Sequence, residues 1–198
     1  MKKRFLIGSF LFLGALCFLS AAVLAQREQR ALSEKLIRLH VIAASDSEAD
    51  QSIKLVVRDA VLAAIGEQNW TSRDEAAAWL TDRLPVLEET AKQTLRASGS
   101  AQTAAVTLSR EHYPTRNYPG FSLPAGEYLS LRVVIGEGEG KNWWCVVYPS
   151  LCSAAQSELP AKAASAGFSE REIRLITADT DGIKLKFKLL EWLSGKKS

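Results

Sequence analysis

The chain has few of the residues on which catalytic and metal sites depend. Its 198 residues include three cysteines, two histidines (His40 and His112) and one methionine. No C-x-x-C or H-E-x-x-H spacing joins these residues, and no G-x-S-x-G motif is present to place a nucleophilic serine. The sequence therefore predicts neither a metal nor a cofactor, and it offers no pattern typical of an enzyme.

A basic excess is also missing from most of the chain. The formal net charge is +3, but the first 25 residues hold three of the 25 basic residues and none of the 22 acidic ones. The remainder is therefore neutral overall, with 22 charges of each sign. Because nucleic-acid binding depends on a clustered basic surface, we expect no nucleic-acid partner.

The N-terminal segment is the one long apolar run. Three basic residues lie within the first four positions, and the 21 residues from Phe5 to Ala25 carry no charge. As a helix this run would be about 31 Å long, enough to span a bilayer. Residues 1–25 are therefore predicted to be a cleaved signal peptide or a retained membrane anchor, with the body of the protein outside the cytoplasm. Residues 26–35 are polar and predict a tether or a frayed helix.

The rest of the chain predicts an α+β fold. Apolar and polar residues alternate over 37–41, which indicates a strand with one buried face. Two long helices are expected next, beginning at Ser47 and Thr71, the second with a kink or a break into two helices at Pro85. An antiparallel sheet follows, in which residues 129–135 and 143–148 form a hairpin around the glycine-rich turn "EGEGKN". We assign residues 36–152 to the α+β domain and 153–198 to a linker with a C-terminal amphipathic element.

Cys145 and Cys152 are the only cysteines outside the N-terminal segment. Cys145 lies in the middle of a predicted strand, where nothing would lower its pKa and activate it as a nucleophile. In an oxidising compartment the pair could form a disulfide, and a pair of buried thiols is the alternative. The adjacent Trp143 and Trp144 are expected on opposite faces of the strand.

Two stretches resemble the stage II sporulation protein R family. They are "LIRLHVIAASDSEADQSIKLVVRDAVL", residues 36–62, and "YPTRNYPGFSLPAGEYLSLRVVIGEGEGKNWWCVVYPSLC", residues 113–152. The resemblance implies a secreted or membrane-anchored signalling protein of endospore formation, made in the forespore and located between the forespore and mother-cell membranes. There it would activate a membrane-embedded aspartic protease of the mother cell, which processes the sigma-E precursor. The resemblance implies no catalytic residue.

Residues for contact with such a protease are predicted in the loop 113–128 and around the glycine-rich turn. The side chains that we expect to be exposed there are Arg116, Tyr118, Phe121 and one of the two tryptophans, Trp143 or Trp144, because aromatic and arginine side chains dominate protein interfaces. From the residues alone, an extracytoplasmic hydrolase acting on cell wall or peptide stays open as the alternative.

Overall fold

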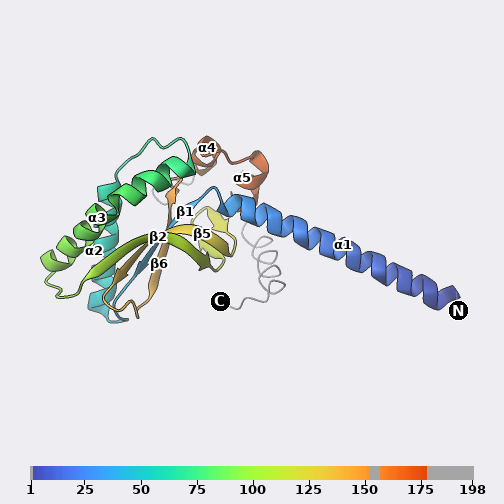
Figure 1. Ribbon diagram of the computed structural model, residues 1–198, viewed down its shortest axis with the longest axis horizontal. Coiled ribbons are helices and arrows are strands. Elements are labelled where there is room, and N and C mark those ends of the chain that lie inside the picture. The colour runs from blue at the N-terminus through green and yellow to red at the C-terminus, as the bar shows by residue number, and fades with distance from the viewer. Residues whose placement is uncertain (1, 152–156, 178–198) are drawn as a thin grey trace.

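The computed structural model describes residues 2–151 and 157–177, which form helices around a mixed sheet (Figure 1). The elements in chain order are α1 (Lys2–Ser33), β1 (Ile37–Ile42), α2 (Glu48–Ile65), α3 (Arg73–Ala97), β2 (Ala104–Tyr113), β3 (Arg116–Tyr118), β4 (Phe121–Leu123), β5 (Gly126–Ile135), β6 (Asn142–Tyr148), α4 (Leu159–Ser165) and α5 (Glu170–Thr177). The predicted α+β class is confirmed.

The strand order of the main sheet is β2-β5-β1-β6. Strand β1 pairs in parallel with β5 and antiparallel with β6, and β2 pairs antiparallel with β5. The predicted hairpin is therefore wrong: β5 and β6 do not pair with each other, because β1 lies between them. The connection over residues 136–141 must span two strand spacings, about 10 Å, and cross the end of β1.

Glycines allow this crossing to lie close to the end of β1. The Gly140 amide donates to the Ala43 carbonyl at 2.9 Å, and a Cβ at Gly140 would collide with the backbone carbonyl of Ser45. The Lys141 amide donates to the Asp46 carboxylate at 2.8 Å. The segment read from sequence as a turn at the tip of a hairpin is thus a packed bridge over the central strand.

Strand β1 is buried on both faces, whereas the sequence predicted one exposed face. Ile37, Leu39 and Val41 contribute to a core beneath α2 and α3, which both cover this face (Figure 1). The alternate residues Arg38 and His40 lie on the opposite face and are 0% and 6% exposed. An alternating pattern indicates one apolar face, but it does not reveal whether the polar face is also covered.

The two long helices begin with side-chain caps. The Ser47 hydroxyl accepts from the Asp50 amide, as the sequence predicts, whereas α3 is capped by Ser72 rather than by Thr71. Helix α3 continues as one element through Pro85, so the predicted break into two helices does not occur. Val56, on α2, is 49% exposed.

A second core lies on the other face of the sheet. It unites the end of α1 with the small hairpin β3–β4 and the short helices α4 and α5, and its buried members include Leu32, Leu36, Tyr128 and Phe168. Residues predicted as a linker after Cys152 therefore include two helices that pack on the domain. The predicted C-terminal amphipathic element beyond residue 177 lies outside the described residues.

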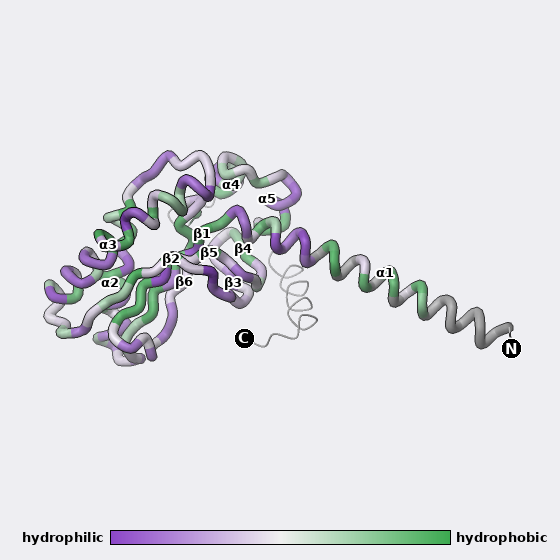
Figure 2. Tube along the Cα trace, in the orientation of Figure 1, coloured by the Kyte–Doolittle hydropathy of each residue, from purple (hydrophilic) through white to green (hydrophobic). Residues whose placement is uncertain are grey.

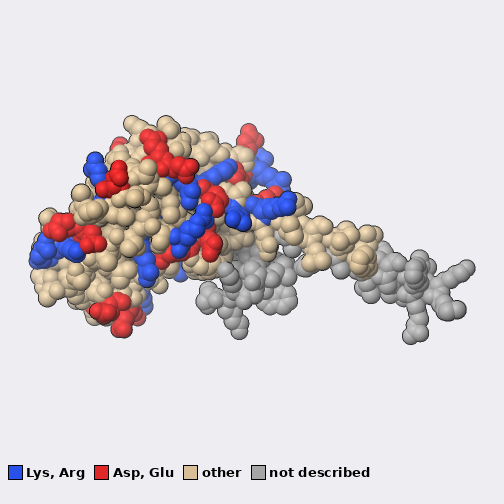
Figure 3. Space-filling view, in the orientation of Figure 1, with Lys and Arg blue, Asp and Glu red and all other residues tan. Residues whose placement is uncertain are grey.

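Helix α1 projects from the domain as a long rod, with hydrophobic residues along its described middle part (Figure 2). It continues through the predicted tether to Ser33. Among the residues that the structure describes, no helix has both the length and the apolar character needed to cross a membrane. On the face of the domain in Figure 3, acidic and basic side chains are interspersed, in keeping with its balanced charge.

Candidate interaction site on the second face of the sheet

Arg38 lies at the centre of a buried cluster of tyrosines. Its Nε donates to the Cys145 carbonyl at 3.2 Å, and its Nη2 donates to the Tyr118 hydroxyl at 2.5 Å. The guanidinium carbon lies 4.2 Å from the centre of the Tyr113 ring and 4.9 Å from that of Tyr128. Within residues 2–151 and 157–177, no acceptor lies within hydrogen-bond distance of Nη1. Aromatic faces and hydroxyls thus stabilise a buried cation for which no ion-pair partner occurs among the described residues.

The tyrosines of this cluster remain protonated. Burial raises the pKa of Tyr113, Tyr118 and Tyr128, and the nearby Arg38 charge offsets only part of that rise. The Tyr113 hydroxyl is 2.7 Å from the Ser130 hydroxyl, and the Tyr128 hydroxyl donates to the Pro124 carbonyl at 2.6 Å. Each phenol therefore has a structural hydrogen bond.

His40 lies next to this cluster, stacked on Trp144 with ring centres 3.7 Å apart. Its Nδ1 is 3.3 Å from both carboxylate oxygens of Glu111, and its Nε2 is 2.7 Å from Asn142 Oδ1. Because both ring nitrogens are engaged, neither is available to take a proton from a substrate without breaking a contact. This arrangement orients the imidazole, and it does not form a nucleophile–base pair.

Glu111 connects His40 to Arg132, whose Nε is 3.4 Å from its carboxylate. Burial raises the pKa of Glu111, but hydrogen bonds from His40 and Ser130 and the charge of Arg132 outweigh burial, so the pKa lies below its usual value. The carboxylate is therefore ionised at neutral pH and fixes the positions of the two basic side chains.

Trp144 lies between this cluster and the surface of the domain. Arg116, on β3, lies over its ring at 5.0 Å, so the indole is in contact with Arg116 as well as with His40. Trp144 and Arg116 are both partly exposed. They form an accessible pair of the residue types that dominate interfaces.

The other predicted contact residues differ in exposure. Phe121 is 3% exposed and stacks on Tyr118, with ring centres 4.6 Å apart, so the expectation that Phe121 is exposed is wrong. Its side chain is drawn into the second core. Trp143 lies on the opposite face from Trp144, partly buried against the first core, with Arg58 over its ring at 4.7 Å.

Cys145 is 2% exposed in β6. Cys152 lies outside the described residues, so its disulfide with Cys145 stays a prediction. No group of three or more metal-ligating side chains occurs in the described part of the chain.

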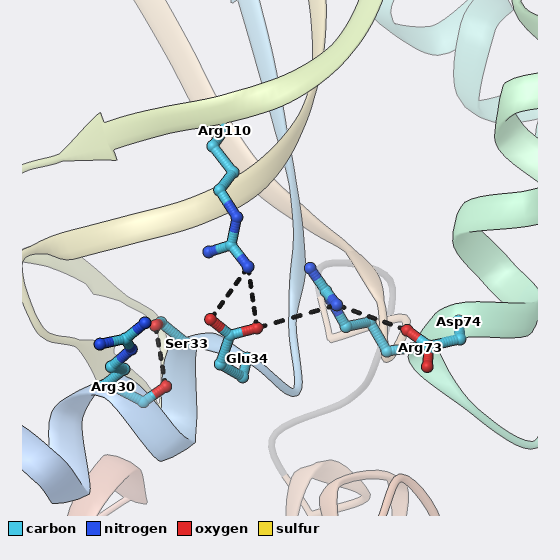
Figure 4. A network of polar contacts seen from close by, with 6 residues as sticks. All are labelled: Arg30, Ser33, Glu34, Arg73, Asp74 and Arg110. Atoms are coloured by element: carbon cyan, nitrogen blue, oxygen red, sulfur yellow. Dashed lines mark hydrogen bonds and ion pairs between the residues drawn. The ribbon is translucent and has the colours of Figure 1, made fainter.

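The end of α1 is joined to the domain by a polar network (Figure 4). The Glu34 carboxylate accepts from Arg110 of β2 at 3.0 and 3.1 Å and lies 3.8 Å from Arg73 at the start of α3. The Ser33 hydroxyl donates to the Arg30 carbonyl, within the last turn of the helix. Together with the fully buried Leu32, these contacts make the end of α1 part of the folded domain.

Sequence reasoning missed Arg38, His40 and Glu111. In a strand with one exposed face, alternating arginine and histidine suggest solvent contact, and nothing in β1 itself indicates a cover. The available signal was the tyrosine-rich segment 113–128, because tyrosines can accommodate a buried cation with ring faces and hydroxyls.

Comparisons with known proteins give a consistent result. The sequence model of the family "Stage II sporulation protein R" matches residues 33–158. The stage II sporulation protein R of Bacillus subtilis (strain 168) is 34% identical over an alignment of 220 residues, which covers 98% of each chain. No solved structure matches significantly.

Proposed function

Since the chain belongs to the stage II sporulation protein R family, we propose that it is an exported, non-catalytic signalling protein of endospore formation. In this proposal it activates a membrane-embedded aspartic protease of the mother cell, which then processes the sigma-E precursor. The family match, which extends over nearly the whole described domain, carries the proposal. The apolar leader supports export into the space between the two membranes.

The arrangement of side chains favours binding over hydrolysis. A hydrolase would require an accessible acid–base pair, but three side chains that could contribute to one have structural contacts. Asp46 accepts from the backbone of the crossing loop, His40 is engaged through both nitrogens, and Cys145 is buried. These three side chains therefore give the hydrolase alternative no support.

We propose the surface around Trp144 and Arg116 as the contact with the protease. The indole is fixed by His40 beneath it, so little side-chain entropy would be lost on binding. Tyr118 and Phe121 support the hairpin that carries Arg116, and Trp143 marks the opposite face of β6. Contact could activate the protease only if this surface binds its active arrangement more tightly than its inactive one.

Reconstituted processing tests the proposal. The protease and the sigma-E precursor would be co-expressed in a non-sporulating host with and without this protein, and the processed fraction measured by immunoblot. Processing should require the wild-type chain. If the precursor is processed equally without it, the signalling function is refuted.

Single variants test the surface separately. Arg116→Ala and Trp144→Phe should each lower processing at least about fivefold, the effect of a moderate interface contact. Arg110→Ala, which removes an arginine paired with Glu34 outside this surface, is the matched control. Normal processing by both surface variants, at wild-type protein levels, would exclude this surface while leaving the signalling function intact.

A further inference from the structure

The two adjacent tryptophans of β6 each lie under an arginine, but only one of these arginines has a counter-ion. Arg58, over Trp143, donates to the Asp59 carboxylate at 2.8 Å. Arg116 lies 5.0 Å from the centre of the Trp144 ring, and no carboxylate within residues 2–151 and 157–177 pairs with it. Arg116 therefore brings an uncompensated positive charge to the surface around Trp144.

Packing holds this arginine in a defined position. The Trp144 ring beneath it stacks on His40 and meets the Tyr113 ring edge-on, with ring centres 4.6 Å apart. The Nε of Arg116 is buried, while the side chain as a whole is partly exposed. A guanidinium is planar, and its fork of N–H groups matches the two oxygens of a carboxylate. A carboxylate would thus meet a cation that is already oriented, at a small cost in side-chain entropy.

A second arginine lies on the same face of the sheet. Arg132 of β5 is in register with His40 of β1, which is in register with Trp144 of β6. These three residues form a row across the sheet, and the Cα atoms at its two ends are about 10 Å apart. The Arg132 side chain is 42% exposed. The row therefore has an accessible arginine at one end and the Arg116–Trp144 pair at the other.

Positive charge exceeds negative charge around this row. Arg38, Arg116 and Arg132 are permanently charged. In the described part of the chain, Glu111 is the only carboxylate paired with any of these arginines or with His40. Three cations and one anion leave an excess of two positive charges, although the chain after its leader is neutral overall. The excess is a local feature, and it favours a partner that brings negative charge.

The size of this excess distinguishes between acidic partners. Anionic lipid is bound by clusters of about 4–8 basic residues. Here only Arg116 and Arg132 are accessible, since Arg38 is buried. Two separate guanidinium groups beside an indole suit one or two carboxylates of a protein segment, because each guanidinium can bind one carboxylate through paired hydrogen bonds.

We infer that the surface around Trp144 and Arg116 recognises an acidic segment of its partner protein, with an Asp or Glu carboxylate bound to Arg116 and a second one near Arg132. This inference rests on the proposed signalling function, in which the same surface contacts the partner. It adds the chemistry of the segment that is recognised.

Peptide binding tests the inference in the absence of protease and precursor. Rhodamine-labelled hexaglutamate and hexaglutamine would be titrated with the full-length chain in uncharged detergent micelles at about 50 mM salt, and binding followed by fluorescence anisotropy. Hexaglutamate should bind at least about tenfold more tightly, and its affinity should fall as the salt concentration rises. Equal affinity for the two peptides would overturn the inference. The signalling function would be unaffected, because precursor processing is measured separately.

Variants assign the binding to this surface. Arg116→Gln should weaken hexaglutamate binding at least about fivefold, and Arg132→Gln, which leaves Arg116 in place, about threefold. Arg83→Gln is the matched control, because Arg83 is exposed, lies 5.0 Å over the Trp79 ring and carries the same charge. It should change binding less than about twofold. Equal losses in the Arg116 and Arg83 variants would show a general attraction by charge and refute the assignment.

A competition experiment separates carboxylate from phosphate recognition. Glutarate and glycerol 3-phosphate are small dianions of similar size, and each would be used to displace hexaglutamate from the wild-type chain. Glutarate should compete at least as well as glycerol 3-phosphate. Stronger competition by glycerol 3-phosphate, lost in Arg116→Gln, would instead identify a site for phosphate-bearing headgroups and overturn the inference.

Discussion

The buried guanidinium of Arg38 makes the Tyr118 hydroxyl more important to stability than an ordinary tyrosine hydroxyl. Removing it by Tyr118→Phe leaves the ring in place but deprives Arg38 Nη2 of the acceptor that it contacts at 2.5 Å. Nη1 already has no acceptor in the described part of the chain, so the variant would hold a buried cation with one remaining hydrogen bond to that part, from Nε to the Cys145 carbonyl. A hydrogen bond to a charged group contributes about 1.5–3 kcal/mol, and we expect the free energy of unfolding to fall by about 2 kcal/mol.

The cause can be isolated with a double-mutant cycle. Arg38→Met removes the charge and keeps an apolar chain of similar length, so it should itself be tolerated with a loss of about 1 kcal/mol. In the Arg38→Met background, Tyr118→Phe should lower stability by less than about 0.5 kcal/mol, which gives a coupling energy of about 1.5 kcal/mol. Urea unfolding of the full-length protein in detergent, followed by tryptophan fluorescence, measures all four proteins.

Tyr113→Phe is the matched control for this cycle. The Tyr113 ring also packs on Arg38, but its hydroxyl pairs with Ser130. Its loss should lower stability by about 1 kcal/mol in both backgrounds. If Tyr118→Phe has the same effect with and without Arg38, the hydroxyl does not stabilise the buried charge and the reasoning is refuted.

Three further predictions concern other parts of the fold. Gly140→Ala should lower the free energy of unfolding by about 3 kcal/mol or more in urea titrations, because its Cβ would collide with the backbone where the loop crosses β1; a loss below about 1 kcal/mol would contradict the close crossing. In the folded protein the pKa of Glu111 is lowered from 4.5. The ionised Glu111 carboxylate therefore stabilises the fold fully above pH 4.5, and this stabilisation disappears as the pH falls through the folded-state pKa. Glu111→Gln should therefore lose less stability than the wild type between about pH 5 and pH 3, and parallel pH profiles would argue against the His40–Glu111 contact. Alkylation followed by mass spectrometry should label only Cys17 in the unreduced full-length chain and all three cysteines after reduction; labelling of Cys145 and Cys152 without reduction would exclude their disulfide.

The sequence predicted elements best where the signal is local. The Ser47 cap and the end of α2 at Gly66 follow from capping rules that involve a few neighbouring residues. The alternation in β1 identified a strand, and the opposite orientations of Trp143 and Trp144 follow from the geometry of any strand.

Predictions failed where the answer depends on residues distant in sequence. The glycine-rich segment 136–141 has the composition of a hairpin turn, but its glycines permit close passage over β1. Phe121 lies in a loop rich in proline and glycine, which suggests exposure, yet it is buried against the second core. Neither outcome has a local signature.

The sequence by itself determined the α+β class, the apolar leader, the balanced charge of the body and, through two idiosyncratic stretches, the family. Only the tertiary structure decided that β1 is the inner strand between β5 and β6, and that Arg38 and His40 are buried beneath a second layer. The physical reason is that propensity, capping and alternation act over a few residues, whereas strand order and burial depend on which surfaces the whole chain brings together. The contacts of Arg38 with Tyr118 and Cys145 span 80 and 107 residues, and no local pattern encodes them.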